Sequence, residues 1–126
     1  MKLGVCTLAC GIWFSSTAIA HHSFAAEYDA EKPASIAGTV TKIDWQNPHV
    51  YLTVEAKDET GKTSIMTVEG HPPNILRRTG WTRDSIKVGD SVSISGWASK
   101  DGSQRMAGRE VTWPDGKKLF VGPPSH

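Results

Sequence analysis

The sequence has little cysteine, almost no net charge and no long apolar run. Its only two cysteines, Cys6 and Cys10, lie within the first ten residues. Fourteen Lys and Arg residues balance thirteen Asp and Glu residues, so nothing favours nucleic acid or an anionic membrane as a partner. The apolar run at residues 3–14 is shorter than the roughly 20 residues that span a bilayer. These absences argue against a membrane anchor and a nucleic-acid-binding protein.

Common catalytic motifs are also missing. The chain contains no G-x-S-x-G nucleophile elbow, no H-E-x-x-H pair and no phosphate-binding loop. No spacing of its histidines and cysteines matches a closed zinc site. The adjacent carboxylates Asp58 and Glu59 lie in a polar stretch typical of a hairpin loop, where solvated charge is the simpler interpretation. We therefore assign no catalytic residue and expect a binding protein rather than an enzyme.

The first 20 residues have the three parts of a secretory signal peptide: a basic start at Lys2, an apolar run, and alanines at positions −3 and −1 of a cut after Ala20. Cleavage there predicts a periplasmic protein that begins at His21, lacks cysteine, carries no formal net charge and does not insert into a membrane. The alternative is lipoprotein processing before Cys10, which would leave His21 inside a longer tail.

Hydrophobic alternation dominates the rest of the chain. Residues 35–45 alternate with a phase change near Thr41, which predicts a long strand with a bulge. Residues 73–80 predict a short helix that begins at prolines and has Gly80 at its C′ position. Four further alternating segments predict strands at residues 50–55, 63–69, 91–98 and 104–113, and a short sixth strand is expected at residues 117–121.

Five or six short strands with one helix after the third predict an all-β fold, a small antiparallel OB-like barrel. A small sandwich or a different roll would fit the same strands. Phe24 and Tyr28 could pin the segment before the first strand to this domain. We divide the chain into a cleavable signal peptide (1–20), an N-terminal arm (21–33), the barrel domain (34–121) and a loose tail (122–126).

A free amino terminus at His21 would carry two metal ligands on one residue, its α-amine and its imidazole Nδ1. A third histidine nitrogen would complete a T-shaped set of three nitrogens, the arrangement known as a histidine brace. Tetragonal nitrogen coordination suits Cu(II), which makes copper the favoured cofactor. The amine can lose its proton because its pKa lies near 8.

Several histidines could supply the third nitrogen. His22 is adjacent to His21, and His49 lies where the first hairpin enters its second strand. His71 lies between the third strand and the helix, and His126, near the end of the sequence, is the weakest candidate. The metal candidates are His21, His22 and His49. The simpler alternative is that the paired histidines are solvated residues on an arm.

Aromatic residues suggest a second, metal-free function. Tryptophans can stack on sugars or aromatic ligands, although such residues more often fill a core. The weaker ligand-binding candidates are Trp45, Tyr51, His71 and Trp97. The second hypothesis is an interaction module for a protein, peptide or glycan. The third is a copper-dependent oxidase or monooxygenase, which needs the same site with an open coordination position.

Four stretches carry a family resemblance: "HHSFAAEYD", "GTVTKIDWQNPHVYL", "GWTRDSIKVGD" and "DGKKLF". With them the chain resembles a family of short exported proteobacterial proteins of unknown function. The resemblance implies an exported, single-domain β-protein without cysteine, and it supplies no activity, ligand or catalytic residue. The paired histidines and the "NPH" turn look like regular parts of the family pattern, which favours His21, His22 and His49 over His71.

Overall fold

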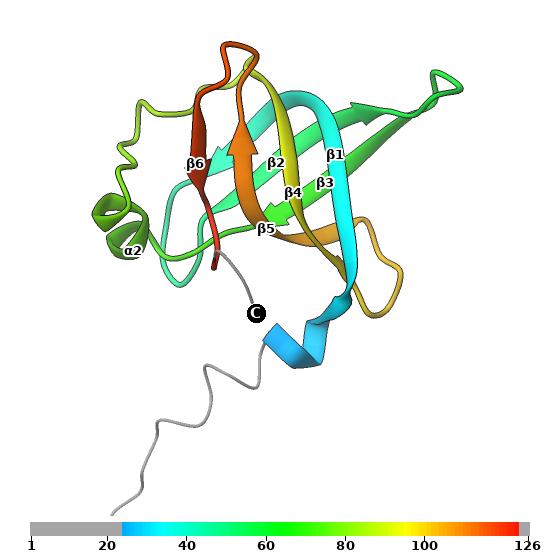
Figure 1. The fold of residues 1–126 in the computed structure, drawn as a ribbon, viewed down its shortest axis with the longest axis horizontal. Helices are drawn as coiled ribbons and strands as arrows, with labels where there is room; N and C mark the ends of the chain where they lie inside the picture. The colour runs from blue at the N-terminus through cyan, green and yellow to red at the C-terminus, as the bar shows by residue number, and fades with distance from the viewer. Residues whose placement is uncertain (1–23, 124–126) are drawn as a thin grey trace, which may run out of the picture.

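The structure is a computed structural model that describes residues 24–123 (Figure 1). The expected signal peptide, His21, His22 and residues 124–126 lie outside this range. A helical turn at residues 24–27 precedes six strands and a second short helix. These elements are β1 (Tyr28–Asp44), β2 (Tyr51–Lys57), β3 (Thr63–Glu69), α2 (Pro73–Arg78), β4 (Ser91–Ser99), β5 (Arg105–Thr112) and β6 (Lys118–Phe120).

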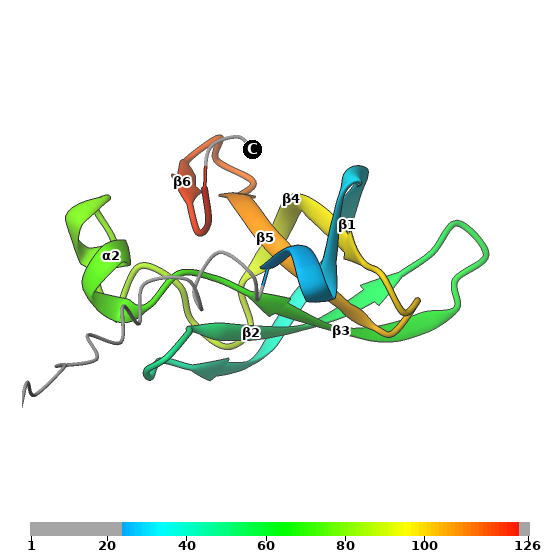
Figure 2. The ribbon, with the colours of Figure 1, turned by 90° about the horizontal axis from the view of Figure 1, so that it is seen from below.

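The strands form one sheet that closes into a barrel. Their order is β3-β2-β1-β4-β5-β6, and an additional pairing joins β3 to β5 (Figures 1 and 2). That closing pair is parallel and includes Val68 opposite Met106, whereas the other pairs are antiparallel. With α2 between β3 and β4, this is the arrangement of an OB-fold, so the predicted fold class is confirmed.

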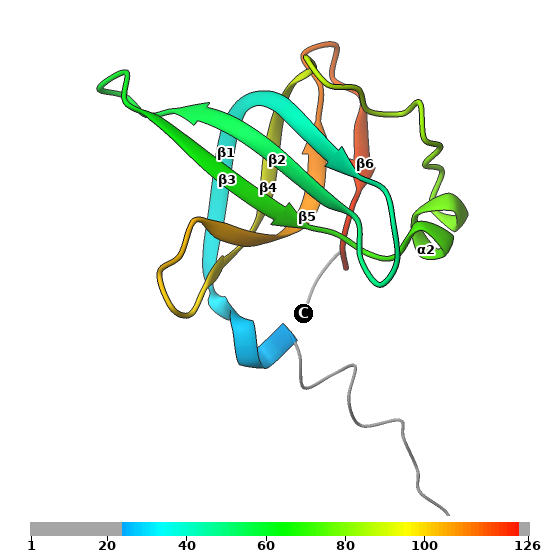
Figure 3. The same cartoon turned by 180° about the vertical axis from the view of Figure 1, so that it is seen from behind.

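Alternation along the strands builds the core. Val50, Leu52 and Val54 are at most 1% exposed, as their shared parity predicted. The bulge expected in the first strand is also present, because the pairing register between β1 and β2 shifts between Val40 and Lys42. The long β1 can therefore bend and pair with β2 at one end and β4 at the other (Figure 3).

Helix α2 covers one end of the barrel with an apolar side chain. Leu76 is fully buried, and Gly80 follows the helix with a φ of +99°, which suits the glycine expected there. Next in the chain, Trp81 packs against Trp113 at a ring separation of 5.8 Å. Its indole N–H donates to the Phe120 carbonyl at 2.7 Å, which ties this end to β6. No helix within residues 24–123 is long and apolar enough to cross a membrane.

The first strand starts earlier than expected, because Tyr28–Pro33 belongs to β1 rather than to a separate arm. Tyr28 pairs with Ser99 and Pro33 with Trp97, and the register is irregular between the two pairs. The intervening residues 29–32 show no alternation, which explains why the sequence did not predict a strand there. Phe24 and Tyr28 do pin this segment, since their rings lie 5.5 Å apart and that of Phe24 meets Trp97 edge-on at 5.8 Å.

The chain after β6 is anchored against the barrel as far as Gly122. Val121 is buried, and the N–H groups of Val121 and Gly122 both donate to the Arg109 carbonyl, at 2.9 and 3.2 Å. A side chain at Gly122 would meet the Gly108 carbonyl oxygen at 2.0 Å, so only glycine allows this close approach. The loose tail that we expected at residues 122–126 therefore begins with a residue, Gly122, that is hydrogen-bonded to the barrel.

Candidate functional site

A groove of about 780 Å³ opens at the end of the barrel where several chain segments meet. The helical turn at 24–27 and the start of β1 form one side, and the last residues of β3 continue into Gly70 and His71 on the other. Its lining includes both the first and the last described residues, Phe24 and Pro123. The volume lies within the range of roughly 300–1,000 Å³ that is typical of small-ligand sites.

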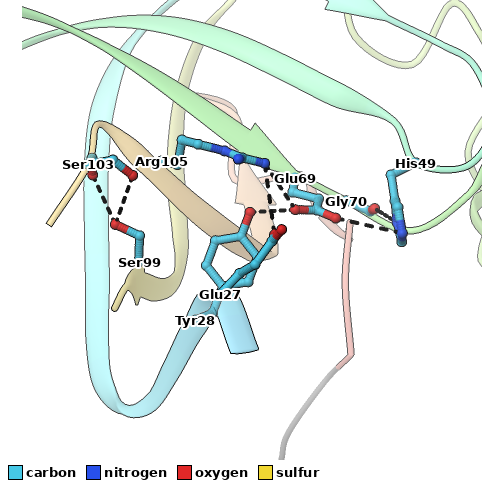
Figure 4. A network of polar contacts seen from close by, with 8 residues as sticks. All are labelled: Glu27, Tyr28, His49, Glu69, Gly70, Ser99, Ser103 and Arg105. Atoms are coloured by element: carbon cyan, nitrogen blue, oxygen red, sulfur yellow. Dashed lines mark hydrogen bonds and ion pairs between the residues drawn. The ribbon is translucent and has the colours of Figure 1, made fainter. Parts of the chain in front are cut away.

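Glu69 is the central charged residue of this groove (Figure 4). Its side chain is only 15% exposed, and its Oε2 accepts a hydrogen bond from the Tyr28 hydroxyl. The Nη2 atom of Arg105 lies 3.6 Å from the same oxygen and 3.9 Å from Oε2 of Glu27. One carboxylate oxygen of Glu69 is therefore fully engaged, and Oε1 points toward His49.

His49 is held with a defined ring orientation. Its Nδ1 lies 3.0 Å from the Gly70 carbonyl oxygen, which can only accept, so Nδ1 carries the proton of this hydrogen bond. The other ring nitrogen, Nε2, lies 3.6 Å from Oε1 of Glu69. Two states fit this geometry. A protonated imidazole can pair with the Glu69 carboxylate, or a neutral imidazole can direct its Nε2 lone pair at a cation that the carboxylate also binds.

The two tyrosines near this network remain neutral donors at ordinary pH. Burial, followed by the hydrogen bond to Glu69, raises the pKa of Tyr28 well above its usual value. Burial and then the charge of Glu69 also raise the pKa of Tyr51, whose ring meets that of His49 at 6.5 Å. Tyr28 can therefore orient the Glu69 carboxylate without competing for a cation as a phenolate.

The structure brings His49 and His71 to the same groove. The His71 carbonyl accepts from Val50 N–H at 3.2 Å, and its own N–H donates to the Val121 carbonyl at 2.8 Å. His21 and His22 fall outside the described residues, three and two positions before Phe24. Within residues 24–123, no three His, Cys, Asp or Glu side chains are grouped so that they could hold a metal ion.

The aromatic ligand-binding candidates lie in different surroundings. Trp97 is 8% exposed and packs with Phe24 and Tyr28. Trp45 is partly buried and packs on Trp81 at a ring separation of 6.4 Å. Both indoles therefore contribute to packing, which was the simpler alternative for them, whereas Tyr51 lies beside His49.

Sequence reasoning missed Glu69, Tyr28 and Arg105 as site residues. In the sequence Glu69 is one more outward-facing polar residue at the end of a strand. Its neighbours come from the start of β1 and the start of β5, which meet it only through the β3–β5 pairing and the contact of Tyr28 with Glu69. Placing the residues one by one on the OB topology could have found the Glu69–Arg105 proximity. In the parallel β3–β5 pair, Glu69 lies opposite Ala107, two residues after Arg105.

Comparisons with known proteins agree with the fold and leave the activity open. None of the curated proteins matches the chain. The crystal structure of Rim1, a mitochondrial single-stranded DNA binding protein from S. cerevisiae, is similar, with a TM-score of 0.51 and 11% sequence identity. The alignment covers 68% of this chain and 97% of that one, and at this identity it shows the fold alone. A family described as of unknown function (DUF6152) matches residues 9–108. Since this match covers most of the chain, the protein belongs to that family.

Proposed function

We propose that this protein is an exported periplasmic metal-binding protein whose groove holds a copper ion between His49 and the amino-terminal His21. Copper is favoured because the amine and imidazole of a terminal histidine, with one more imidazole, form a tetragonal nitrogen set. The observation that carries the proposal is the orientation of His49. Its Nδ1 is fixed by a backbone carbonyl, and its Nε2 faces a carboxylate 3.6 Å away.

That orientation is the usual arrangement of a metal-binding histidine. Such residues donate one ring N–H to a carbonyl or carboxylate, which fixes the tautomer and aims the other nitrogen at the ion. An ion at about 2.0–2.2 Å from both a histidine nitrogen and a carboxylate oxygen fits between His49 and Glu69, since the two atoms are 3.6 Å apart. Tyr28 and Arg105 hold the other oxygen of Glu69 and so fix its position.

The reach of the chain supports His21 as the partner. Phe24 lines the groove and is pinned by Tyr28 and Trp97. His21 precedes it by three positions, and an extended chain covers about 10 Å over that length. An amino terminus at His21 would therefore start within about 10 Å of the groove lining at Phe24.

The test starts from protein that the cell has exported and processed. Mass spectrometry of the periplasmic fraction establishes whether the chain starts at His21. We expect tight 1:1 binding of Cu(II), followed by isothermal titration and by nitrogen hyperfine structure in electron paramagnetic resonance. His21→Ala and His49→Gln should each weaken binding at least as much as the roughly 10–100-fold that loss of an outer-shell partner costs. Asn47→Ala, in the same loop as His49, is the matched control and should bind normally.

A cytoplasmic form that retains an initiator methionine directly before His21 moves the amine and should bind as weakly as His21→Ala. If His49→Gln binds Cu(II) with unchanged affinity, the His49–Glu69 pair is an ordinary ion pair and the proposal is refuted. If the exported protein binds no metal, the groove favours the second hypothesis, an interaction module for a peptide or glycan.

A further inference from the structure

The groove is much larger than the His49–Glu69 pair needs. Most of the residues between 24 and 31 line it on one side, and the loop between β4 and β5 contributes Lys100. A metal ion lies only about 2.0–2.2 Å from its ligand atoms, so an ion between two side chains fills a small part of about 780 Å³. The groove is therefore large enough for an organic ligand besides an ion.

The groove also lies at the two loops that OB-folds commonly use for binding. His49 belongs to the loop between β1 and β2, and Lys100 to the loop between β4 and β5. OB-folds bind oligonucleotides and oligosaccharides at these loops and on the face of their second and third strands. These two classes of ligand differ in charge, so the charge of the groove separates them.

The groove carries many charged groups that largely balance one another. Three of its four carboxylates lie within 4.0 Å of a basic side chain: Arg105 contacts Glu27 and Glu69 (Figure 4), and Lys32 contacts Asp29. Its charged lining residues are Glu27, Asp29, Glu31, Glu69 and Lys100. A phosphodiester chain binds through Lys and Arg side chains, and here it would meet carboxylates. A strongly basic ligand would compete with Arg105 and Lys32, so the groove suits a polar ligand without net charge.

The paired carboxylates can still accept hydrogen bonds from a ligand. Nη2 of Arg105 lies 3.9 Å from the Glu27 oxygen, and Nζ of Lys32 lies 4.0 Å from the Asp29 oxygen. Both distances exceed the roughly 2.7–2.9 Å of a charge-assisted hydrogen bond, and a carboxylate has about four lone-pair positions. Phe24 and Ala30 line the same side of the groove with apolar groups. This combination matches a sugar ring, which presents hydroxyl groups at its edge and C–H groups on its faces.

We propose that this groove binds a neutral oligosaccharide. Its hydroxyl groups donate to Glu27 and Asp29, and the C–H face of a sugar ring packs on Phe24 and Ala30. The inference goes beyond the proposed metal site and does not depend on it, because it uses the residues between 24 and 31 and not the His49–Glu69 pair.

The test is a titration of the exported protein with cellotetraose, maltotetraose and N,N′,N″,N‴-tetraacetylchitotetraose, followed by backbone amide resonances, with a chelator present. We expect at least one of them to shift the amides of Gly70, Gly108 and Lys100. Ala30→Phe fills the groove with a ring and should abolish these shifts. Ala37→Phe is the matched control, because Ala37 is also exposed on β1 and does not line the groove. Ala25→Phe, an exposed position on the helical turn, is a second blocking variant.

Absence of shifts with all three oligosaccharides would overturn the inference. Shifts that persist in both blocking variants, or that Ala37→Phe removes equally, would overturn it as well. Binding of a thymidine tetranucleotide or of tetralysine in place of the oligosaccharides would assign the groove to another class of ligand and reject a saccharide. The chelator separates this result from the metal site, whose failure appears only in the Cu(II) titrations.

Discussion

Tyr28→Phe tests the network around Glu69 most directly. The substitution removes one hydroxyl from a side chain that is 3% exposed and leaves its ring contacts in place. A hydrogen bond to a charged group contributes about 1.5–3 kcal/mol. Because Glu69 is 15% exposed and keeps Arg105, we expect the low end, about 1.5 kcal/mol. For a domain of this size, that lowers the melting temperature by roughly 6–12 °C.

Tyr28→Phe should also change how the free energy of unfolding depends on pH. Burial and the hydrogen bond to Glu69 raise the pKa of Tyr28 in the folded protein, whereas in the unfolded chain it ionises near pH 10. The stabilisation by the hydroxyl is therefore complete below about pH 10 and declines above it, by about 1.4 kcal/mol at pH 11. The difference between the two proteins should thus nearly vanish at about pH 11. Other groups titrate equally in both proteins and cancel.

The assay is urea unfolding followed by tryptophan fluorescence, at about pH 7 and about pH 11, with a chelator present so that no metal contributes. The quantity compared is the difference in free energy of unfolding between the two proteins. Equal stability near pH 7 would show that the hydroxyl does not stabilise the fold. A difference that stays constant up to about pH 11 would refute the claim that burial and Glu69 keep this hydroxyl protonated.

Two further predictions concern the tyrosines together and the barrel backbone. The sequence has two tyrosines, and the pKa of each is raised. The tyrosinate absorbance of the folded protein should therefore show no half-titration near pH 10. The chain unfolded in guanidinium should titrate there. A normal titration of the folded protein would contradict both shifts. A side chain at Gly96 would meet the Ala107 carbonyl oxygen at 1.8 Å, so Gly96→Ala should break the β4–β5 pairing and yield little folded protein. Gly61→Ala, which meets no atom within 4 Å but has a φ of +82°, should cost only about 1–2 kcal/mol, as measured by thermal unfolding.

Local patterns predicted most of the fold. Alternation located β2 and β3 to within about a residue or two, and the change of phase at Thr41 located the bulge. The helix followed from its prolines and Gly80, since these residues restrict the backbone wherever they occur. The sequence did not predict the start of β1, because its pairing with β4 is irregular and its residues show no alternation.

The site was less accessible to sequence reasoning because its contacts come from distant segments. His49 was identified from its place beside a turn, and the structure puts it in the groove. Glu69, Tyr28 and Arg105 acquire their roles only where β3 meets β5 and the start of β1 folds over them. No local pattern encodes that meeting, so a single sequence could not have assigned the partners of Glu69.

The closing pair of the barrel has a consequence for how the chain folds. Strands β1, β2 and β3 form a meander of neighbours, and β1 and β3 are its two edges. The β4–β5 hairpin joins both edges at once, β4 to β1 and β5 to β3. Until residue 107 is available, a growing chain therefore exposes two unpaired strand edges, the usual route to aggregation. Docking of the β4–β5 hairpin pairs both edges, so this late step closes the barrel.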